Sequence, residues 1–197
     1  MVRMLCVELI DRDGKVIEER CVDKDIFEEY VRSRKDDSTN NWITLIGAIF
    51  QAVANGESYS LTIVDVDGIS VSAYFKYPWT SPASIFSTAY GDLNAYISLG
   101  TDSTPASISD YKLRSKVVDK AVERISIDTA NRVISLTSTF VFTTAITLYE
   151  IGLELDVVAL VGGTYTKTRI LIDRTVISGG IAVQSGQGLR VTYRFSL

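Results

Sequence analysis

Two glutamates, Glu150 and Glu154, are the residues of this sequence whose spacing comes nearest to a catalytic pair. They lie four positions apart, and in a strand this spacing puts both on one face, roughly 13 Å from each other. Paired carboxyl groups in glycosidases lie about 5–9.5 Å apart. The sequence also contains no histidine, which removes the commonest general base. We therefore expect no enzyme, and a carboxylate-based glycosidase is the weakest alternative.

Metal chemistry has little support in the sequence. The two cysteines, Cys6 and Cys21, are too few for a structural zinc site when no histidine can complete it. Two Asp-x-Asp-Gly segments begin at Asp11 and Asp65 and match the start of a calcium loop. The positions of its later oxygen ligands hold lysine, isoleucine or valine, which cannot supply them. These segments therefore predict hairpin turns, and we expect no metal or cofactor.

The register of the first of these hairpins decides whether the two cysteines can form a disulfide. A two-residue turn at 13–14 would place Cys6 opposite Cys21, and directly opposed residues have Cα atoms about 4.5–5.5 Å apart, close enough for a disulfide. The same register opposes two glutamates, so a slip that puts Cys6 opposite Arg20 is an alternative. Reduced thiols are the other alternative, because the cytoplasm is reducing.

Composition indicates a folded protein without an affinity for polyanions. Hydrophobic residues make up 46% of the 197 residues, and the formal net charge is −4. This composition excludes a disordered chain, and the negative charge disfavours nucleic-acid partners. The longest apolar run, 42–54, is too short and too interrupted to span a membrane. Because no export signal is visible, we expect the protein to be made in the cytoplasm.

The N-terminal half predicts a small α+β region: a hairpin, two helices and a second hairpin. The hairpins are expected over 2–22 and 58–77, and the first helix after the N-cap candidates Asp23 and Asp25. The second helix has a wide apolar face, which is either core or a subunit interface. The residues of this face are Trp42, Leu45, Ile46, Ile49, Phe50 and Val53.

Aromatic residues gather where this half ends. Tyr74, Tyr77 and Trp79 could form a platform for a glycan, whereas aromatic residues at the end of a strand more often belong to a core or a subunit contact. Two prolines between 78 and 84 interrupt the strand pattern. The sequence therefore predicts three regions: 1–77, a linker or boundary at 78–94, and 95–197.

The C-terminal region predicts an antiparallel β-sandwich, jelly-roll-like, from short strands separated by glycine-rich turns. Strands over 122–127 and 133–142 flank a turn, and further turns are expected at 162–163, 178–180 and 185–188. In the strand 149–156, apolar residues alternate with Glu150, Gly152, Glu154 and Asp156. This alternation predicts one buried face and one solvated face.

The order of elements around 95–153 resembles a module of viral structural proteins. A strand at 95–99 is followed by a loop at 101–110 that contains Pro105, then by Tyr111-Lys112-Leu113, a hairpin and the strand Tyr149-Glu150-Ile151-Gly152-Leu153. This order resembles tail, baseplate and fibre-attachment proteins of tailed bacteriophages and related archaeal viruses. The resemblance covers about half of the chain, and 1–77 has no counterpart in it.

The resemblance implies an assembling protein. We expect a virion structural protein, a repeated subunit of a tail, baseplate, turret or portal-attached ring, that contacts itself and other virion proteins and is assembled in the host cytoplasm. In the resemblance, Tyr111 and Leu113 plug the sandwich. The alternative from another class is a glycan-binding module that attaches to a host glycan.

Overall fold

The computed structural model describes residues 2–23, 45, 59–75, 84–85, 87 and 92–196, and within them eleven strands form two antiparallel sheets. Sheet A has the order β2-β1-β11-β8-β7, from β1 (Val2–Ile10), β2 (Val16–Asp23), β7 (Arg124–Asp128), β8 (Val133–Val141) and β11 (Gly188–Ser196). Sheet B has the order β3-β4-β9-β5-β6, and β10 pairs with β9. Its strands are β3 (Tyr59–Val64), β4 (Ser70–Phe75), β5 (Ala95–Gly100), β6 (Lys116–Ala121), β9 (Ile146–Val161) and β10 (Thr164–Val183). The expected mainly-β antiparallel sandwich is confirmed.

Alternating side chains from both sheets form one apolar core. Leu5, Val191 and Tyr193 of sheet A are fully or almost fully buried, and they belong to the same cluster as Ile97 and Ile151 of sheet B. Because successive residues of a strand point to opposite faces, each inward residue is followed by one on the outer face. The even-numbered residues of β9 beside Ile151 therefore face away from this core.

Both hairpins of the N-terminal half are part of the sandwich. β1 pairs with β11 from Val2 to Ile10, so the first hairpin forms one side of sheet A. β4 pairs with β9 through Ser72 and Leu160 and so connects the second hairpin to sheet B. The structure thus differs from the expected separate appendage, because hydrogen bonds between strands far apart in the sequence join these hairpins to the C-terminal strands.

The two hairpin turns have one geometry, which differs from the expected two-residue turn. Gly14 and Gly68 adopt positive φ angles of 82° and 81°, whereas the preceding residues do not. In the first turn, Asp11 Oδ1 accepts hydrogen bonds from the backbone of Asp13 and Lys15, both at 2.9 Å. This is a three-residue loop with glycine at the left-handed position. Each leading aspartate is therefore occupied by backbone amides.

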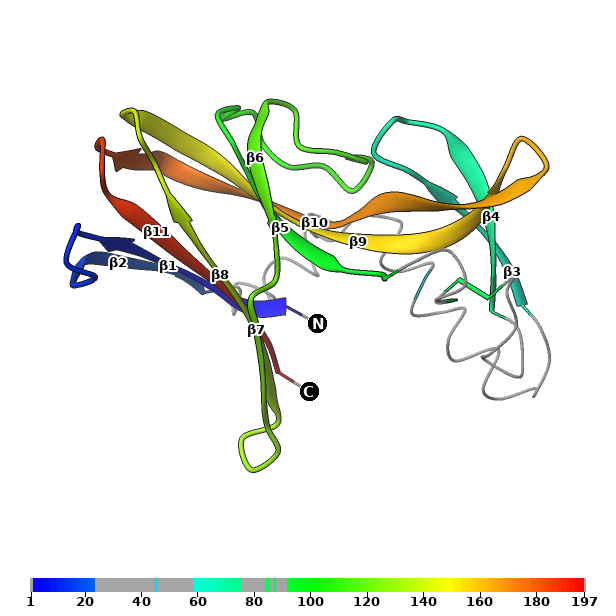
Figure 1. Cartoon of the computed structure of the whole chain (residues 1–197), viewed down its shortest axis with the longest axis horizontal. Coiled ribbons are helices and arrows are strands. Elements are labelled where there is room, and N and C mark those ends of the chain that lie inside the picture. The colour runs from blue at the N-terminus through cyan, green and yellow to red at the C-terminus, as the bar shows by residue number, and fades with distance from the viewer. Residues whose placement is uncertain are drawn as a thin grey trace.

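β9 and β10 form a long hairpin that runs across the molecule (Figure 1). Its turn is at 162–163, as expected, and both glycines there have positive φ. The expected turn at 178–180 is instead an irregularity within β10: the register shifts between Val176 and Ile181. Gly179 and Gly180 accommodate it with φ angles of 76° and 65°, which other residues rarely adopt.

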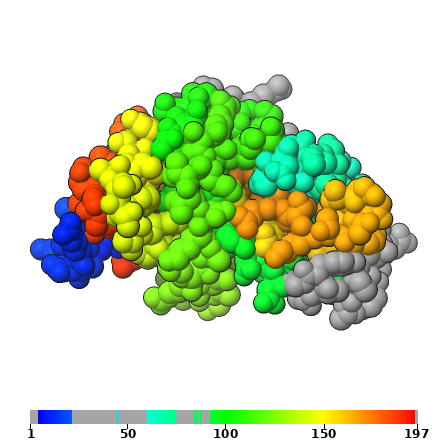
Figure 2. Space-filling model, turned by 45° about the horizontal axis from the view of Figure 1, so that its top comes forward, coloured from blue at the N-terminus to red at the C-terminus, as the bar shows by residue number. Residues whose placement is uncertain are grey.

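The two expected N-terminal helices lie outside the described residues, apart from Leu45, which is buried. Among the residues that the structure describes, no helix has the length and apolarity needed to cross a membrane. The segment that leads from β5 to β6 lies over the middle of the molecule, beside β10 (green and orange in Figure 2). This segment covers the outer face of sheet B.

Candidate functional site

Glu150 lies on the outer face of β9 and has no exposed surface. Its carboxylate accepts hydrogen bonds from the backbone amides of Arg114 (3.1 Å) and Ser115 (2.7 Å) and from Arg174 Nε (2.7 Å). A side chain at Gly100 would collide with it, because a Cβ there would lie 2.4 Å from Glu150 Oε1. Three donors, one of them a cation, therefore fix the position of this carboxylate.

Arg174 of β10 is the cation of this site and is also fully buried. Besides Glu150, it donates to Asp110 Oδ2 (3.0 Å), to the Thr104 carbonyl oxygen (3.2 Å) and to Asp102 Oδ1 (3.3 Å). Hydrogen bonds from Thr104, and then the charge of Arg174, hold the pKa of Asp102 below its ordinary value. Residues 101–115, which we call the anchored loop, are thus tied to β9 and β10.

A β-bulge in β10 directs Arg174 toward this site. The register with β9 shifts between Leu171 and Asp173. Before this shift the odd-numbered residues of β10 point to the outer face of sheet B, and after it the even-numbered residues do. Arg174 then lies opposite Gly152, on the same face as Glu150. Bulges commonly redirect a side chain in this way. If the same sequence continued in the register of Leu171, Arg174 would lie opposite Ile151 and point into the core.

Leu113 and Tyr111 pack the anchored loop onto sheet B. Leu113 is 3% exposed, and its Cδ1 atom lies 2.1 Å from where a Cβ of Gly152 would be. The absence of a side chain at Gly152 therefore makes room for Leu113. Tyr111 is half-buried and covers Gly68, in the turn between β3 and β4. Leu113 thus occupies a gap in the outer face of the sheet rather than in the sandwich core.

A second charged cluster follows along the outer face of β9. Glu154 and Asp156 are 0% and 3% exposed. Glu154 pairs with Lys116 Nζ (3.2 Å) and Arg169 Nη1 (3.4 Å), while Asp156 accepts from Arg169 Nε (3.1 Å). The Arg169 guanidinium stacks on the ring of Tyr96 at 3.5 Å, a cation–π contact.

The face of β9 expected to be solvated is therefore buried, and that expectation was wrong. Burial of a carboxylate is tolerated when a cation or amide donors compensate for the lost hydration. Glu150 and Glu154 both have such partners, supplied by the anchored loop, by β6 and by β10. Neither carboxylate presents a free oxygen surface to a substrate.

Most of the aromatic and helical candidates fall outside the described residues. Tyr74 is described, and its ring lies edge-to-face with Tyr165 at 6.1 Å. Tyr77 and Trp79, the other two members of the expected glycan platform, are not described. The same holds for the helix residues Trp42, Ile46, Ile49, Phe50 and Val53.

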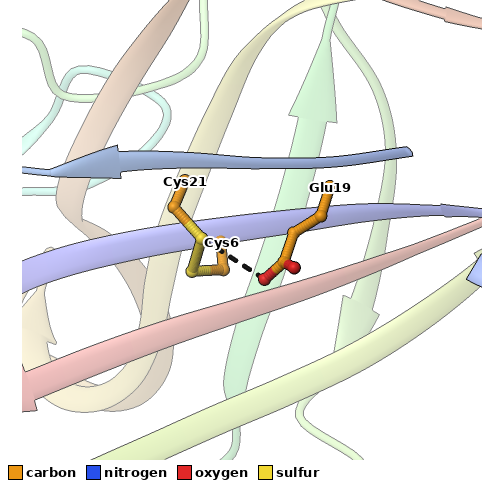
Figure 3. Close-up of side chains that lie close together, drawn as sticks. All are labelled: Cys6, Glu19 and Cys21. Carbon is orange, nitrogen blue, oxygen red and sulfur yellow. Dashed lines mark hydrogen bonds between the residues drawn. A yellow bond between two sulfur atoms is a disulfide. The ribbon is translucent and has the colours of Figure 1, made fainter.

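A disulfide joins Cys6 and Cys21, which are opposed in the register of β1 and β2 (Figure 3). Their Cα atoms are 4.1 Å apart. Glu19 Oε1 lies 3.5 Å from Cys21 Sγ. These three side chains could ligate a metal ion by distance, but the disulfide occupies both sulfurs.

The two edges of sheet A differ in character. On the β2 edge, Glu18, Glu19 and Arg20 are exposed charged residues, and the register with β1 shifts between Leu9 and Ile10. Charges and bulges are the usual protection of an edge strand. On the β7 edge, Ile125 and Ile127 are 62% and 68% exposed. The β7–β8 hairpin projects from the body of the molecule (Figure 1), so this apolar edge is accessible.

Sequence reasoning missed Arg174 as the centre of the buried cluster. A signal was present: Asp173-Arg174-Thr175 is a polar triplet inside the apolar run of β10, and charged residues are seldom buried without partners. The partners could not be identified from the sequence, because Glu150 and Asp110 lie 24 and 64 residues away.

The sequence matches no known family model, and neither curated proteins nor solved structures give a significant match.

Proposed function

We propose that the protein is a structural subunit that works by self-assembly and by docking neighbouring proteins, as in a viral tail, baseplate, turret or portal-attached ring. The observation that carries this proposal is the exposed apolar edge of sheet A at Ile125 and Ile127. Exposed apolar strand edges lead to association unless they are protected, so a stable protein that keeps one has a use for it.

The anchored loop supports the same role. It is a surface segment whose shape is held by a buried ion pair and by Leu113, and not by helices or strands of its own. Loops held on a rigid scaffold are well suited to recognition. The ion pair on Glu150 holds the anchored loop, and the ion pairs on Glu154 join β6 and β10 to β9. These structural roles favour docking over acid–base catalysis.

The assembly proposal is tested by light scattering during size-exclusion chromatography over a range of concentrations. We expect a species larger than the monomer at high micromolar concentration, and loss of that species in Ile125→Lys. Val141→Lys is the matched control, because Val141 is 75% exposed and lies on β8 rather than at the edge. A monomer throughout, also after its neighbouring proteins are added, would contradict the proposal.

A further inference from the structure

We propose that β7 pairs with β7 of a second copy, antiparallel, about a two-fold axis that passes through Ser126. This pairing rests on the proposed assembly function and names one contact of that assembly. β7 is the last strand of sheet A. Its five residues, Arg124 to Asp128, are all exposed, and in the described part of the chain only β8 pairs with it.

The backbone groups that β7 leaves open are those of Ile125 and Ile127. Alternate residues of a strand direct their N–H and C=O groups to opposite sides. The Thr137 carbonyl oxygen accepts from the Glu123 amide at 3.0 Å, so Thr137 of β8 faces β7. Arg124 is paired with Thr137. The backbone N–H and C=O groups of Arg124, and of every second residue after it, therefore point toward β8. Ile125 and Ile127, between them, direct their N–H and C=O groups away from the sheet.

These open groups restrict the register of a second β7. In an antiparallel pair with a second β7, Ile125 and Ile127 can form backbone hydrogen bonds only with residues whose N–H and C=O groups are also open. This requirement leaves few possible registers. Only the alignment centred on Ser126 keeps all five residues of both strands paired. Ile125 and Ile127 of one copy then each exchange two backbone hydrogen bonds with the other isoleucine of the second copy.

The side chains match in this same alignment. Arg124 of one copy lies opposite Asp128 of the other, and the two-fold axis produces this ion pair twice. Neither Arg124 nor Asp128 has an ion-pair partner among the described residues. Asp128 accepts hydrogen bonds within its own turn, from the Asn131 backbone amide (3.0 Å) and the Asn131 side-chain amide (2.7 Å). Ile125 and Ile127 meet on the opposite face and continue the apolar surface of sheet A. Charge and apolar surface therefore select a second copy of this chain as the partner.

The contact is small. Five residues from each strand bury far less than the roughly 1,200 Å² typical of stable complexes, so dilute protein should pair weakly. Repetition in an assembly would strengthen such a contact. The test must therefore capture a transient pair in a register-specific way.

Cross-linking through Ser126→Cys provides that test. Ser126 on the axis forms a non-hydrogen-bonded pair, whose Cα atoms lie about 4.5 Å apart, a distance suited to a disulfide. Thr129→Cys is the control, an exposed residue of the same hairpin that would lie about 20 Å from its symmetry mate. Under mild oxidation we expect Ser126→Cys to form covalent dimer at least ten times faster than Thr129→Cys. Equal rates, or no dimer from Ser126→Cys, would overturn the pairing.

Charge reversal in the Ser126→Cys background gives a second readout. Arg124→Asp places two aspartates opposite each other and should slow cross-linking several-fold, whereas Arg132→Asp makes the same change in charge beyond the paired residues and should not. A similar effect of both variants would overturn the register. Light scattering of the unmodified chain reports on assembly separately. Self-association without selective cross-linking would reject this contact and leave the proposed function standing, whereas a monomer under all conditions would reject the function itself.

Discussion

Arg174 contributes to stability chiefly because of the charges that its removal would leave behind. Replacing it by methionine keeps much of the volume but leaves Glu150 buried without its cation, whereas Asp110 keeps its ion pair with Arg114. Breaking a buried pair in this way costs about 3–5 kcal/mol. Arg190→Met is the matched control, because Arg190 pairs with Glu8 on the surface, where such pairs are worth about 1 kcal/mol or less. Urea unfolding measures both, and equal losses would contradict the structural role of Arg174.

Tyr193 should make stability depend on pH in the alkaline range. Burial, and then the charge of Asp173, raise the pKa of Tyr193 well above its ordinary value of 10.0. Above pH 10 the folded protein then binds more protons than the unfolded chain, so this stability is present below about pH 10 and falls as pH rises. Urea unfolding at pH 8 and at pH 11 should show a smaller loss for Tyr193→Phe than for the unchanged protein.

The same Tyr193→Phe change should cost little at pH 8. The Tyr193 hydroxyl is buried beside Asp173 and Thr175 but makes no hydrogen bond of good geometry with either, so its removal should change stability little. An identical loss of stability in the two proteins between pH 8 and pH 11 would show that Tyr193 does not carry the alkaline dependence.

At the scale of elements, the anchored loop depends on the fit between Leu113 and Gly152. Leu113→Ala should cost about 2–5 kcal/mol as a truncation of a buried side chain. Gly152→Ala should cost about 1–3 kcal/mol through overcrowding. Because the two residues touch, the double variant should cost clearly less than both losses added together. Thermal and urea unfolding give these values.

Ile108→Ala is the control for the loop, because Ile108 is 42% exposed and truncation there should change stability by less than about 0.5 kcal/mol. Strict additivity of the Leu113 and Gly152 changes would mean that the two side chains do not share one space.

The hairpin of β1 and β2 should be stabilised by its disulfide. The bond joins residues 15 positions apart, and closing a loop of that length stabilises a protein by about 3 kcal/mol, largely through the unfolded chain. Paired Cys6→Ala and Cys21→Ala changes should lower the urea midpoint accordingly, and reductant should then have no further effect. Intact mass after alkylation provides the check: two alkylated thiols in the unreduced protein would contradict the bond.

Local patterns were enough to predict the hairpins but not the burial of β9. The Asp-Gly pairs and alternating residues mark turns and strands because the geometry of a turn is set within a few residues. Glu150 and Glu154 alternate with apolar residues as in a half-solvated strand. Their burial depends on Arg174 and Lys116, which lie 24 and 38 residues away, and on a bulge that the sequence does not reveal. No local signal distinguishes such a carboxylate from a solvated one.

At the scale of the whole molecule, the fold joins distant parts of the chain. β1 lies between β2 and β11, so the first strand is held by strands at both ends of the sequence. Division of the chain at 78–94 would separate paired strands in both sheets. Sequence patterns identified most of these strands, whereas the pairing of β1 with β11 depends on contacts nearly the full chain apart.

The pairing of β1 with β11 also has a mechanical consequence. Val2 lies opposite Phe195, and the hydrogen bonds of an antiparallel pair run perpendicular to the strands. A force that pulls these two residues apart therefore loads the bonds one after another, and the strands separate like a zipper at low force. Once the separation reaches Cys6, its disulfide with Cys21 holds β1 to β2, so both strands must leave the sheet together. The force needed for further separation should therefore rise at that point. Tension applied along the β9–β10 hairpin would instead load many bonds at once.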